Sequence, residues 1–207
     1  MNEITAITPQ IKDKKRCNIY VDGRFYCGMT LETAVKNRLK VGQTVSPAFL
    51  SKIQLDGEKS TALDKAMTHL SATRKTEKQI RDFLVKKGYL SAVVDYVIEK
   101  LNDYGFLDDK EYAENYVEYA AQKKGVRLIR AEMRRKGLSE ENVDLALQEV
   151  DEETQVATAI TILQKYMRHK EADRETLQKA VKHLLSKGFD YDVAKKAIES
   201  FGEIEED

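Results

Sequence analysis

The sequence Lys87-Gly88-Tyr89 returns as Lys136-Gly137-Leu138 and again as Lys187-Gly188-Phe189. The three glycines recur at spacings of 49 and 51 residues, and apolar residues keep the same offsets from each glycine. Four residues before each glycine stands Leu84, Met133 or Leu184, and six after it Val94, Val143 or Ala194. Ten residues after it stands Ile98, Leu147 or Ile198, and thirteen after it Leu101, Val150 or Phe201. A period of this size predicts tandem helical units, which more often bind extended surfaces than catalyse reactions.

Each of the three glycines is predicted to end a helix. A helix commonly closes on a left-handed residue, which glycine adopts without a Cβ penalty, and an apolar residue just beyond it packs onto the last turn. The expected pairs are Leu84 with Tyr89, Met133 with Leu138, and Leu184 with Phe189. Ser91, Ser139 and Asp190 follow closely and are expected to start the next helices, because their oxygens can accept from free N–H groups.

The predicted fold class is mainly α: three tandem three-helix repeats in an elongated array, preceded by a small N-terminal α/β arm that contains a β-hairpin. The arm is assigned to residues 1–57 and the repeats to residues 60–104, 108–150 and 153–201. The polar, glycine-containing segment 56–60 places the boundary, so the last helix of the arm is expected to end at Leu55. Both prolines of the chain, Pro9 and Pro47, precede the helical region.

The arm is predicted to hold strands at 4–7, 16–21 and 24–29 and helices at 31–37 and 47–55, with a hairpin turn at Asp22-Gly23. A regular hairpin would place Cys17 opposite Gly28 and Cys27 opposite Asn18. The two sulfur atoms would then point to opposite faces of the sheet, which favours free thiols over a disulfide. Free thiols indicate a reducing compartment.

The composition excludes several classes of function. Thirty-five basic residues balance 35 acidic residues among 207, so no global attraction to nucleic acid or to a membrane follows. No apolar stretch approaches the roughly 18 residues of a membrane span, and residues 1–10 lack the pattern of a signal peptide. We expect a cytoplasmic protein that does not bind membranes.

Motifs for catalysis and for cofactor or metal binding are missing from the sequence. It contains no phosphate-binding glycine loop, no dinucleotide-binding fingerprint, no metalloprotease helix motif and no serine nucleophile elbow. His69, His169 and His183 stand apart from one another and from both cysteines. We therefore expect no enzyme activity, no cofactor and no metal site.

Basic and acidic residues separate along the second repeat. Residues 120–137 hold seven basic residues against the single acid Glu132, and residues 138–154 hold seven acids and no base. At 100° per residue, Arg127, Arg130 and Arg134 fall within about 60° of one another beside the apolar stripe. The complete set of candidate contact residues, with its counterparts in the first repeat, is Arg74, Lys75, Lys78, Arg81, Lys123, Lys124, Arg127, Arg130, Arg134, Arg135 and Lys136.

Two interpretations of these bases remain open. They could contact phosphates or an acidic protein surface, since arginine pairs bidentately with either oxyanion. They could equally form a solvated helix face that pairs with Glu140, Glu141 and Asp144. The nearby tyrosines, which could stack on bases or belong to the core, are Tyr104, Tyr112, Tyr116 and Tyr119.

The second repeat resembles the RecX family, the regulatory proteins of the RecA recombinase. The residues that carry the resemblance are Phe106, Leu107, Asp108, Asp109, Tyr112, Ala113, Tyr116, Val117, Lys124, Gly125, Ile129, Arg130 and the run 133–137. The first repeat agrees through Ala66, Leu70, Ile80, Leu84, Lys87, Gly88, Val97, Ile98 and Leu101. The resemblance covers residues 60–201, and the third repeat departs from the family pattern at 170–173.

The resemblance implies a bacterial protein whose partner is the RecA filament on single-stranded DNA, and we expect this protein to be a monomer. Such a protein would lie in the filament groove and inhibit ATP hydrolysis, strand exchange and cleavage of the SOS repressor, as a negative regulator of recombination and repair. Two other hypotheses remain. One is a protein that binds single- or double-stranded DNA through its basic ridge, and the other is an unrelated helical scaffold.

Overall fold

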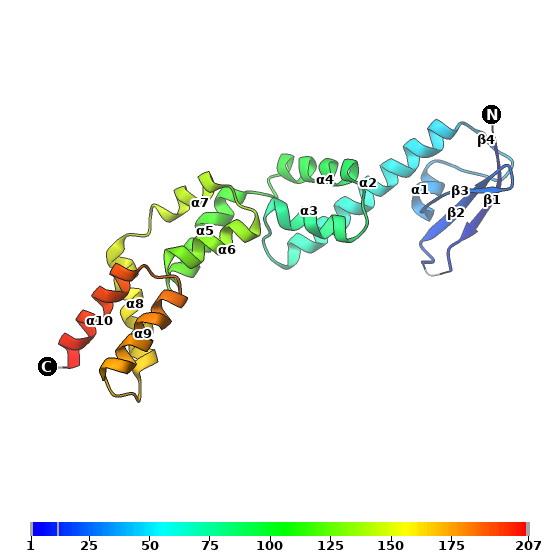
Figure 1. The fold of residues 1–207 in the computed structure, drawn as a ribbon. Coiled ribbons are helices and arrows are strands. Elements are labelled where there is room, and N and C mark those ends of the chain that lie inside the picture. The colour runs from blue at the N-terminus through cyan, green and yellow to red at the C-terminus, as the bar shows by residue number, and fades with distance from the viewer. Residues whose placement is uncertain (1, 12, 206–207) are drawn as a thin grey trace. The chain divides into compact units, whose positions relative to one another are not determined.

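The computed structural model describes residues 2–11 and 13–205. The chain divides into two compact units, one formed by Met1–Thr73 with Ile80–Phe106 and the other by Arg74–Gln79 with Leu107–Asp207. The described residues form four strands and ten helices (Figure 1). Nine of the helices supply three three-helix repeats after the sheet, so the predicted mainly α class is confirmed.

The N-terminal sheet is antiparallel, with strand order β3-β2-β1-β4. Its strands are β1 (Asn2–Pro9), β2 (Arg16–Val21), β3 (Arg24–Thr30) and β4 (Thr44–Val45). β4 was not expected from the sequence, because two residues give no detectable alternation. The short helix α1 (Leu31–Lys36) follows β3, and the side chain of its N-cap Thr30 accepts a hydrogen bond from the Thr33 N–H.

The hairpin register differs from the prediction by one residue. Tyr20 pairs with Phe25 but Ile19 pairs with Cys27, so Tyr26 forms a bulge in β3. The extra residue turns Cys27 to the same face as Cys17, and both side chains are buried in the core of the sheet. The predicted opposite orientation is therefore wrong. Both cysteines are free thiols.

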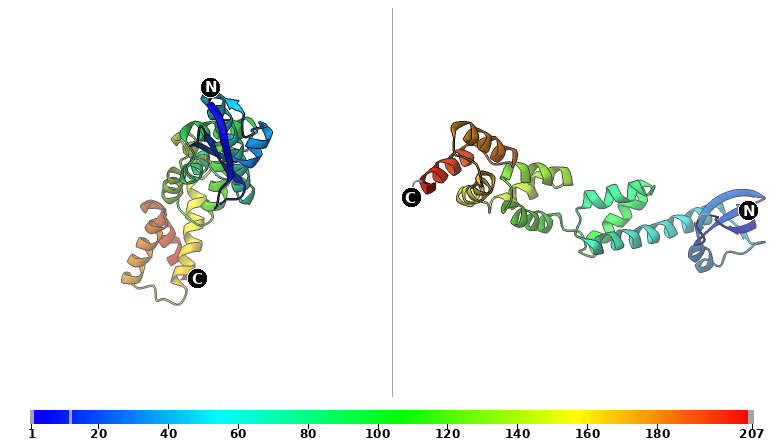
Figure 2. Two further views of the ribbon diagram at one scale, coloured as in Figure 1. Left: turned by 90° about the vertical axis from the view of Figure 1, so that its right-hand side faces the viewer. Right: turned by 90° about the horizontal axis from the view of Figure 1, so that it is seen from below.

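The helix predicted to end at Leu55 continues as α2 (Pro47–Ala72) through the polar segment 56–60. Figure 2 shows it unbroken in its right-hand view. Glycine inside a helix costs only about 1 kcal/mol, which the rest of a long helix can offset. A Cβ atom at Gly57 would overlap the Thr33 hydroxyl, so this glycine permits close packing of α1 on α2 and does not mark a boundary.

The three repeats have the predicted helix order. Repeat 1 contains the C-terminal part of α2, α3 (Glu77–Lys86) and α4 (Ser91–Asp103). Repeat 2 contains α5 (Asp109–Ala121), α6 (Val126–Lys136) and α7 (Glu140–Leu147). Repeat 3 contains α8 (Glu152–Met167), α9 (Arg174–Ser186) and α10 (Tyr191–Glu205).

The three predicted glycine helix ends are confirmed. Gly88, Gly137 and Gly188 have φ of +87°, +90° and +90°. The residue after each glycine donates its N–H to the carbonyl of the residue four positions before that glycine, over 3.2, 3.2 and 3.3 Å. This is the Schellman geometry, in which the following apolar side chain returns to the last helical turn.

The expected starts of the third helices are confirmed only in part. The Ser139 hydroxyl caps α7 by accepting from the Asn142 N–H. Ser91 instead lies inside α4, whose N-cap is Leu90 and has no side-chain hydrogen bond. Asp190 directly precedes α10.

Candidate partner interface

Helix α6 presents the arginines on one side because its other side is the core of repeat 2. Ile129 and Met133 are fully buried against α5 and α7. Residues on the two flanks of this stripe are therefore left at the surface. One flank carries Arg127, Arg130 and Arg134, which we call the arginine flank.

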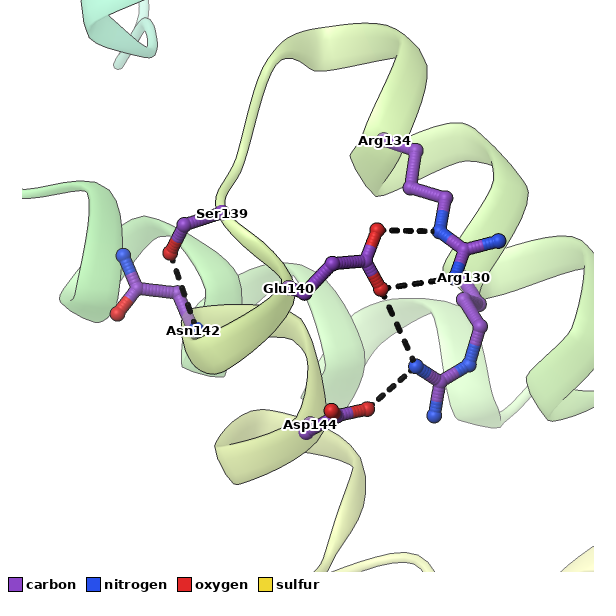
Figure 3. A network of polar contacts seen from close by, with 6 residues as sticks. All are labelled: Arg130, Arg134, Ser139, Glu140, Asn142 and Asp144. Atoms are coloured by element: carbon purple, nitrogen blue, oxygen red, sulfur yellow. Dashed lines mark hydrogen bonds and ion pairs between the residues drawn. The ribbon is translucent and has the colours of Figure 1, made fainter.

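Two residues of the arginine flank pair with acids of the neighbouring helix α7 (Figure 3). The Arg134 guanidinium contacts Glu140 bidentately, with Nε 2.6 Å from Oε1 and Nη2 2.7 Å from Oε2. Arg130 pairs with Asp144 through Nη1 and lies 3.8 Å from Glu140 Oε2. The hydrogen bond from Arg134 lowers the pKa of Glu140, which keeps this carboxylate charged. The alternative of a paired helix face thus describes both arginines as they stand in the folded chain.

Arg127 lies at the start of α6 and reaches into repeat 3. Its Nε atom is 3.6 Å from Oδ1 of Asp190, and both side chains are more than half exposed. At this separation and exposure the pair contributes little to stability, since exposed ion pairs contribute about 0–1 kcal/mol. All three arginines therefore pair with carboxylates of this chain.

The opposite flank of α6 carries a part-buried cluster around Glu132. Lys124 Nζ lies 2.7 Å from both carboxylate oxygens, and the Tyr116 hydroxyl donates to Oε2. Burial raises the pKa of Tyr116, as does its hydrogen bond to the carboxylate. Burial also opposes the charge of Glu132, but the hydrogen bonds from Lys124 and Tyr116 lower its pKa. Lys124 is thus a structural residue of repeat 2.

Two of the remaining candidate bases of repeat 2 contact tyrosines. Lys136 Nζ donates to the Tyr112 hydroxyl over 3.1 Å, and Lys123 Nζ lies 3.7 Å from the centre of the Tyr119 ring. In the part of the chain that the structure describes, neither Lys123 nor Arg135 has a carboxylate within 4 Å. Both side chains keep a positive charge that no described carboxylate contacts directly.

Two of the four tyrosines belong to the core, as the apolar spacing favoured. Tyr112 and Tyr116 pack against the core of repeat 2 with their rings stacked at 6.3 Å. Tyr104 and Tyr119 are more than half exposed. Of these four tyrosines, only Tyr104 and Tyr119 are thus exposed enough to stack on nucleic-acid bases.

The candidates from the first repeat fall into different units. Residues 74–79 belong with repeats 2 and 3, where Arg74 lies 2.5 Å from Glu111. The half-buried Lys75 lies in the same segment, and the side chain of Lys78 covers Gly137. Arg81 belongs to the other unit, where it lies 2.6 Å from Asp95.

Sequence reasoning missed four residues that join the repeats in the second unit. The carboxylate of Asp109 accepts from the Glu77 N–H over 2.9 Å, and the amide oxygen of Gln155 accepts from the Val126 N–H over 3.0 Å. Thr76 and Gly125 precede the two donor residues and lie against the next repeat. Alignment of the repeats on their glycines places Glu77 at the same position as Val126, and this equivalence was the sequence signal that could have pointed to the two contacts.

Other site types find no support in the described residues. None of the helices described is both long and apolar enough to cross a membrane. Within the same residues, no group of three or more His, Cys, Asp or Glu side chains could hold a metal ion.

Comparisons with known proteins identify the family. The RecX N-terminal domain matches residues 2–46, and the first, second and third RecX three-helix domains match residues 62–101, 108–147 and 153–198. The regulatory protein RecX of Clostridium perfringens is 31% identical over 202 residues, covering 96% of this chain and 95% of that protein. The chain belongs to the RecX family. The RecX protein of Listeria innocua is similar as well, with 32% identity across 98% of this chain and 77% of its own length.

Solved structures of RecX agree with this assignment. A crystal structure of regulatory protein RecX superimposes with a TM-score of 0.68 at 27% identity and covers 97% of this chain and all of its own. The crystal structure of RecX from Lactobacillus salivarius gives a TM-score of 0.62 at 28% identity over 69% of this chain and 96% of its own. The predicted resemblance is confirmed, and it extends through the N-terminal sheet. The family is one of regulatory proteins, as expected, and not a family of enzymes.

Proposed function

We propose that this protein is a negative regulator of the RecA recombinase. It binds the groove of RecA filaments on single-stranded DNA and inhibits ATP hydrolysis, strand exchange and SOS co-protease activity. The observation that carries the proposal is the match of all four parts of the chain to RecX domains. The partner acts in the bacterial cytoplasm, so the proposal places a monomer of this protein there.

The arginine flank supports contact with a protein surface rich in carboxylates. Its three guanidinium groups already bind carboxylates of this chain. Carboxylates of a partner could therefore be bound in the same way. The exchange of one exposed carboxylate for another costs little, because the exposed pairs contribute little. Arginine keeps its charge and its planar fork through such an exchange.

The neutral net charge also favours a protein partner over bare DNA. Binding to DNA phosphates depends on counterion release and weakens steeply as salt rises. A protein contact that also buries apolar surface weakens less. Repeats 2 and 3 would supply such a surface, as helical arrays commonly do.

Direct nucleic-acid binding remains the second candidate because of Lys123, Tyr119 and Arg135. Lys123 lies over the exposed Tyr119 ring, and neither it nor Arg135 is neutralised within 4 Å by the described residues. A ring with a nearby cation suits a base and its phosphate. Few side chains are available in this way, so the affinity for DNA alone should be low.

A pull-down separates the two candidates. RecA filaments assembled on single-stranded DNA with a non-hydrolysable nucleotide are immobilised, and retention is compared with RecA lacking nucleotide and with DNA alone. The proposal expects retention on filaments that persists from about 0.05 to 0.2 M salt, where binding to phosphates falls by orders of magnitude. Retention on DNA alone with a steep salt dependence would favour the second candidate.

A further inference from the structure

Two junctions inside the second unit are built alike. In each junction, the first turn of the second helix of one repeat packs on the end of the second helix of the following repeat. That end is the pair Lys136-Gly137 or Lys187-Gly188, which we call a Lys-Gly end. The Thr76 hydroxyl donates to the Lys136 carbonyl over 2.6 Å, and the Gly125 N–H donates to the Lys187 carbonyl over 3.0 Å. A hydroxyl in the first junction and a backbone N–H in the second thus donate to a carbonyl at a helix end that has no partner within its own helix.

Both junctions depend on the missing Cβ atom of the glycine that receives the helix. A Cβ at Gly137 would overlap the side chain of Lys78, and a Cβ at Gly188 would overlap Leu128, including its backbone. The Arg127 N–H also donates to the Gly188 carbonyl over 3.1 Å. A Lys-Gly end is therefore a surface that accepts a helix start, through the side chain of Lys78 at Gly137 and at backbone distance at Gly188.

Repeat 1 has a third Lys-Gly end, and it is open. A Cβ built on Gly88 meets no atom within 4 Å, although the backbone there is left-handed as at the other two ends. No hydrogen bond within the described residues reaches the carbonyls of Lys87 or Gly88. Val85 and Leu90 flank this end with 62% and 68% of their surface exposed. Repeat 2 has Arg134 and Ser139 at the corresponding positions.

A second copy of this chain does not supply the matching helix start. Thr176 of α9 aligns with Thr76 and Gly125, but α9 begins one turn earlier, at Arg174. Its N-cap Asp173 accepts from the Thr176 N–H over 2.7 Å, and a carboxylate, unlike the Thr76 hydroxyl, has no proton to donate to a carbonyl of a Lys-Gly end. The second helix of repeat 3 therefore does not provide a docking helix start, whereas the Lys-Gly end of repeat 1 can still accept one.

We propose that the Lys87-Gly88 end of α3 is a docking site for the first turn of a helix in the protein partner. The inference rests on the proposed function, with a helix start of the recombinase as the occupant. That helix carries a small N-cap residue, as at Thr76 and Gly125, because the Thr76 hydroxyl reaches the Lys136 carbonyl directly and a Cβ at Gly125 would overlap the Gly188 backbone. An acidic first turn suits the exposed Lys86 and Lys87. Nucleic acid is excluded here, since the carbonyl end of a helix repels phosphate.

Gly88→Asn tests the site, because asparagine tolerates the left-handed conformation better than other residues and adds the obstructing Cβ. The matched control is Gly105→Asn, which follows α4 with φ +69° and also faces open space. Both variants should lose the same few degrees of Tm. Inhibition of RecA ATPase by Gly88→Asn should need about tenfold more protein, while Gly105→Asn matches the wild type. Equal inhibition by both variants would overturn the inference, whereas wild-type protein that inhibits nothing would instead refute the proposed function.

A footprint on a third variant keeps the test independent of Gly88. Leu90→Cys introduces an exposed thiol, and the native Cys17 and Cys27 are buried, so a maleimide should label only the new residue. RecA filaments should slow its labelling about tenfold and leave the control Val35→Cys, at an exposed position of α1, unaffected. Unchanged labelling of Leu90→Cys in the presence of bound filament would contradict docking at this end.

Discussion

Arg130 pairs with Asp144 between the second and third helices of repeat 2, and the two residues lie seven positions before and seven after Gly137. Arg81 and Asp95 form the same pair at the same offsets from Gly88, 2.6 Å apart. In repeat 3 these offsets carry Val181 and Lys195, which cannot pair. The arrangement thus distinguishes the two repeats that hold candidate contact arginines from the one that does not.

The Arg130–Asp144 pair should contribute little to stability, because the side chains are 35% and 56% exposed. We expect a double-mutant cycle with Arg130→Ala and Asp144→Ala to give a coupling below about 1 kcal/mol in urea unfolding. A coupling above about 2 kcal/mol would show that the arginine is committed to the fold and not available to a partner.

Neutralising the arginine flank should weaken filament inhibition without loss of helix. The variant replaces Arg127, Arg130 and Arg134 with glutamine, which avoids placing new acids beside Glu140 and Asp144. We expect unchanged circular dichroism and at least about a tenfold rise in the concentration that inhibits RecA ATPase.

A matched control removes the same charge from repeat 3 by replacing the exposed Lys165, Lys182 and Lys195 with glutamine. It should inhibit like the wild type. If both triple variants lose inhibition equally, the effect belongs to net charge and the arginine flank is not a specific contact.

The glycine helix ends should differ in their tolerance of alanine. Gly88→Ala should cost about 1 kcal/mol, the strain of a left-handed alanine, because the surrounding space is open. Gly137→Ala should cost more, since Lys78 must move, and Gly188→Ala most, since it meets the backbone of Leu128. Urea midpoints of the three variants give the order. A Gly188→Ala midpoint equal to that of Gly88→Ala would contradict the backbone junction.

Glu132 should stabilise the fold at neutral pH and lose this effect in acid. Its pKa is lowered in the folded chain, so its contribution is present above the ordinary pKa of a glutamate and is lost as pH falls through the lowered value. The measurement is the difference in unfolding free energy between wild type and Glu132→Gln. We expect this difference to shrink steadily from about pH 6 to pH 3. A difference that grows in acid would mean that burial, and not Lys124 and Tyr116, decides the charge of Glu132.

The sequence predicted the repeats because glycine, the residue before it and the apolar offsets are local signals. Gly88, Gly137 and Gly188 have the expected left-handed backbone. Local signals misled at Gly57, where the reason for glycine is the close packing of Thr33 from another helix. The bulge at Tyr26 was equally invisible, because strand composition does not encode register.

The arginines were predicted as a ridge, and the structure keeps them on one flank of α6. Their pairing with Glu140, Asp144 and Asp190 depends on how α7 and repeat 3 pack, which no helical spacing shows. The junctions at Thr76 and Gly125 were missed for the same reason. Their contacts join residues about 60 positions apart.

The most direct test of the central claim is steady-state ATP hydrolysis by RecA on single-stranded DNA, titrated with this protein. Turnover should fall in a saturable manner while the protein itself hydrolyses no ATP. Single-stranded DNA in excess should not relieve the inhibition, because the target is the filament. An unchanged rate under conditions where a pull-down shows the filaments saturated with this protein would contradict the account.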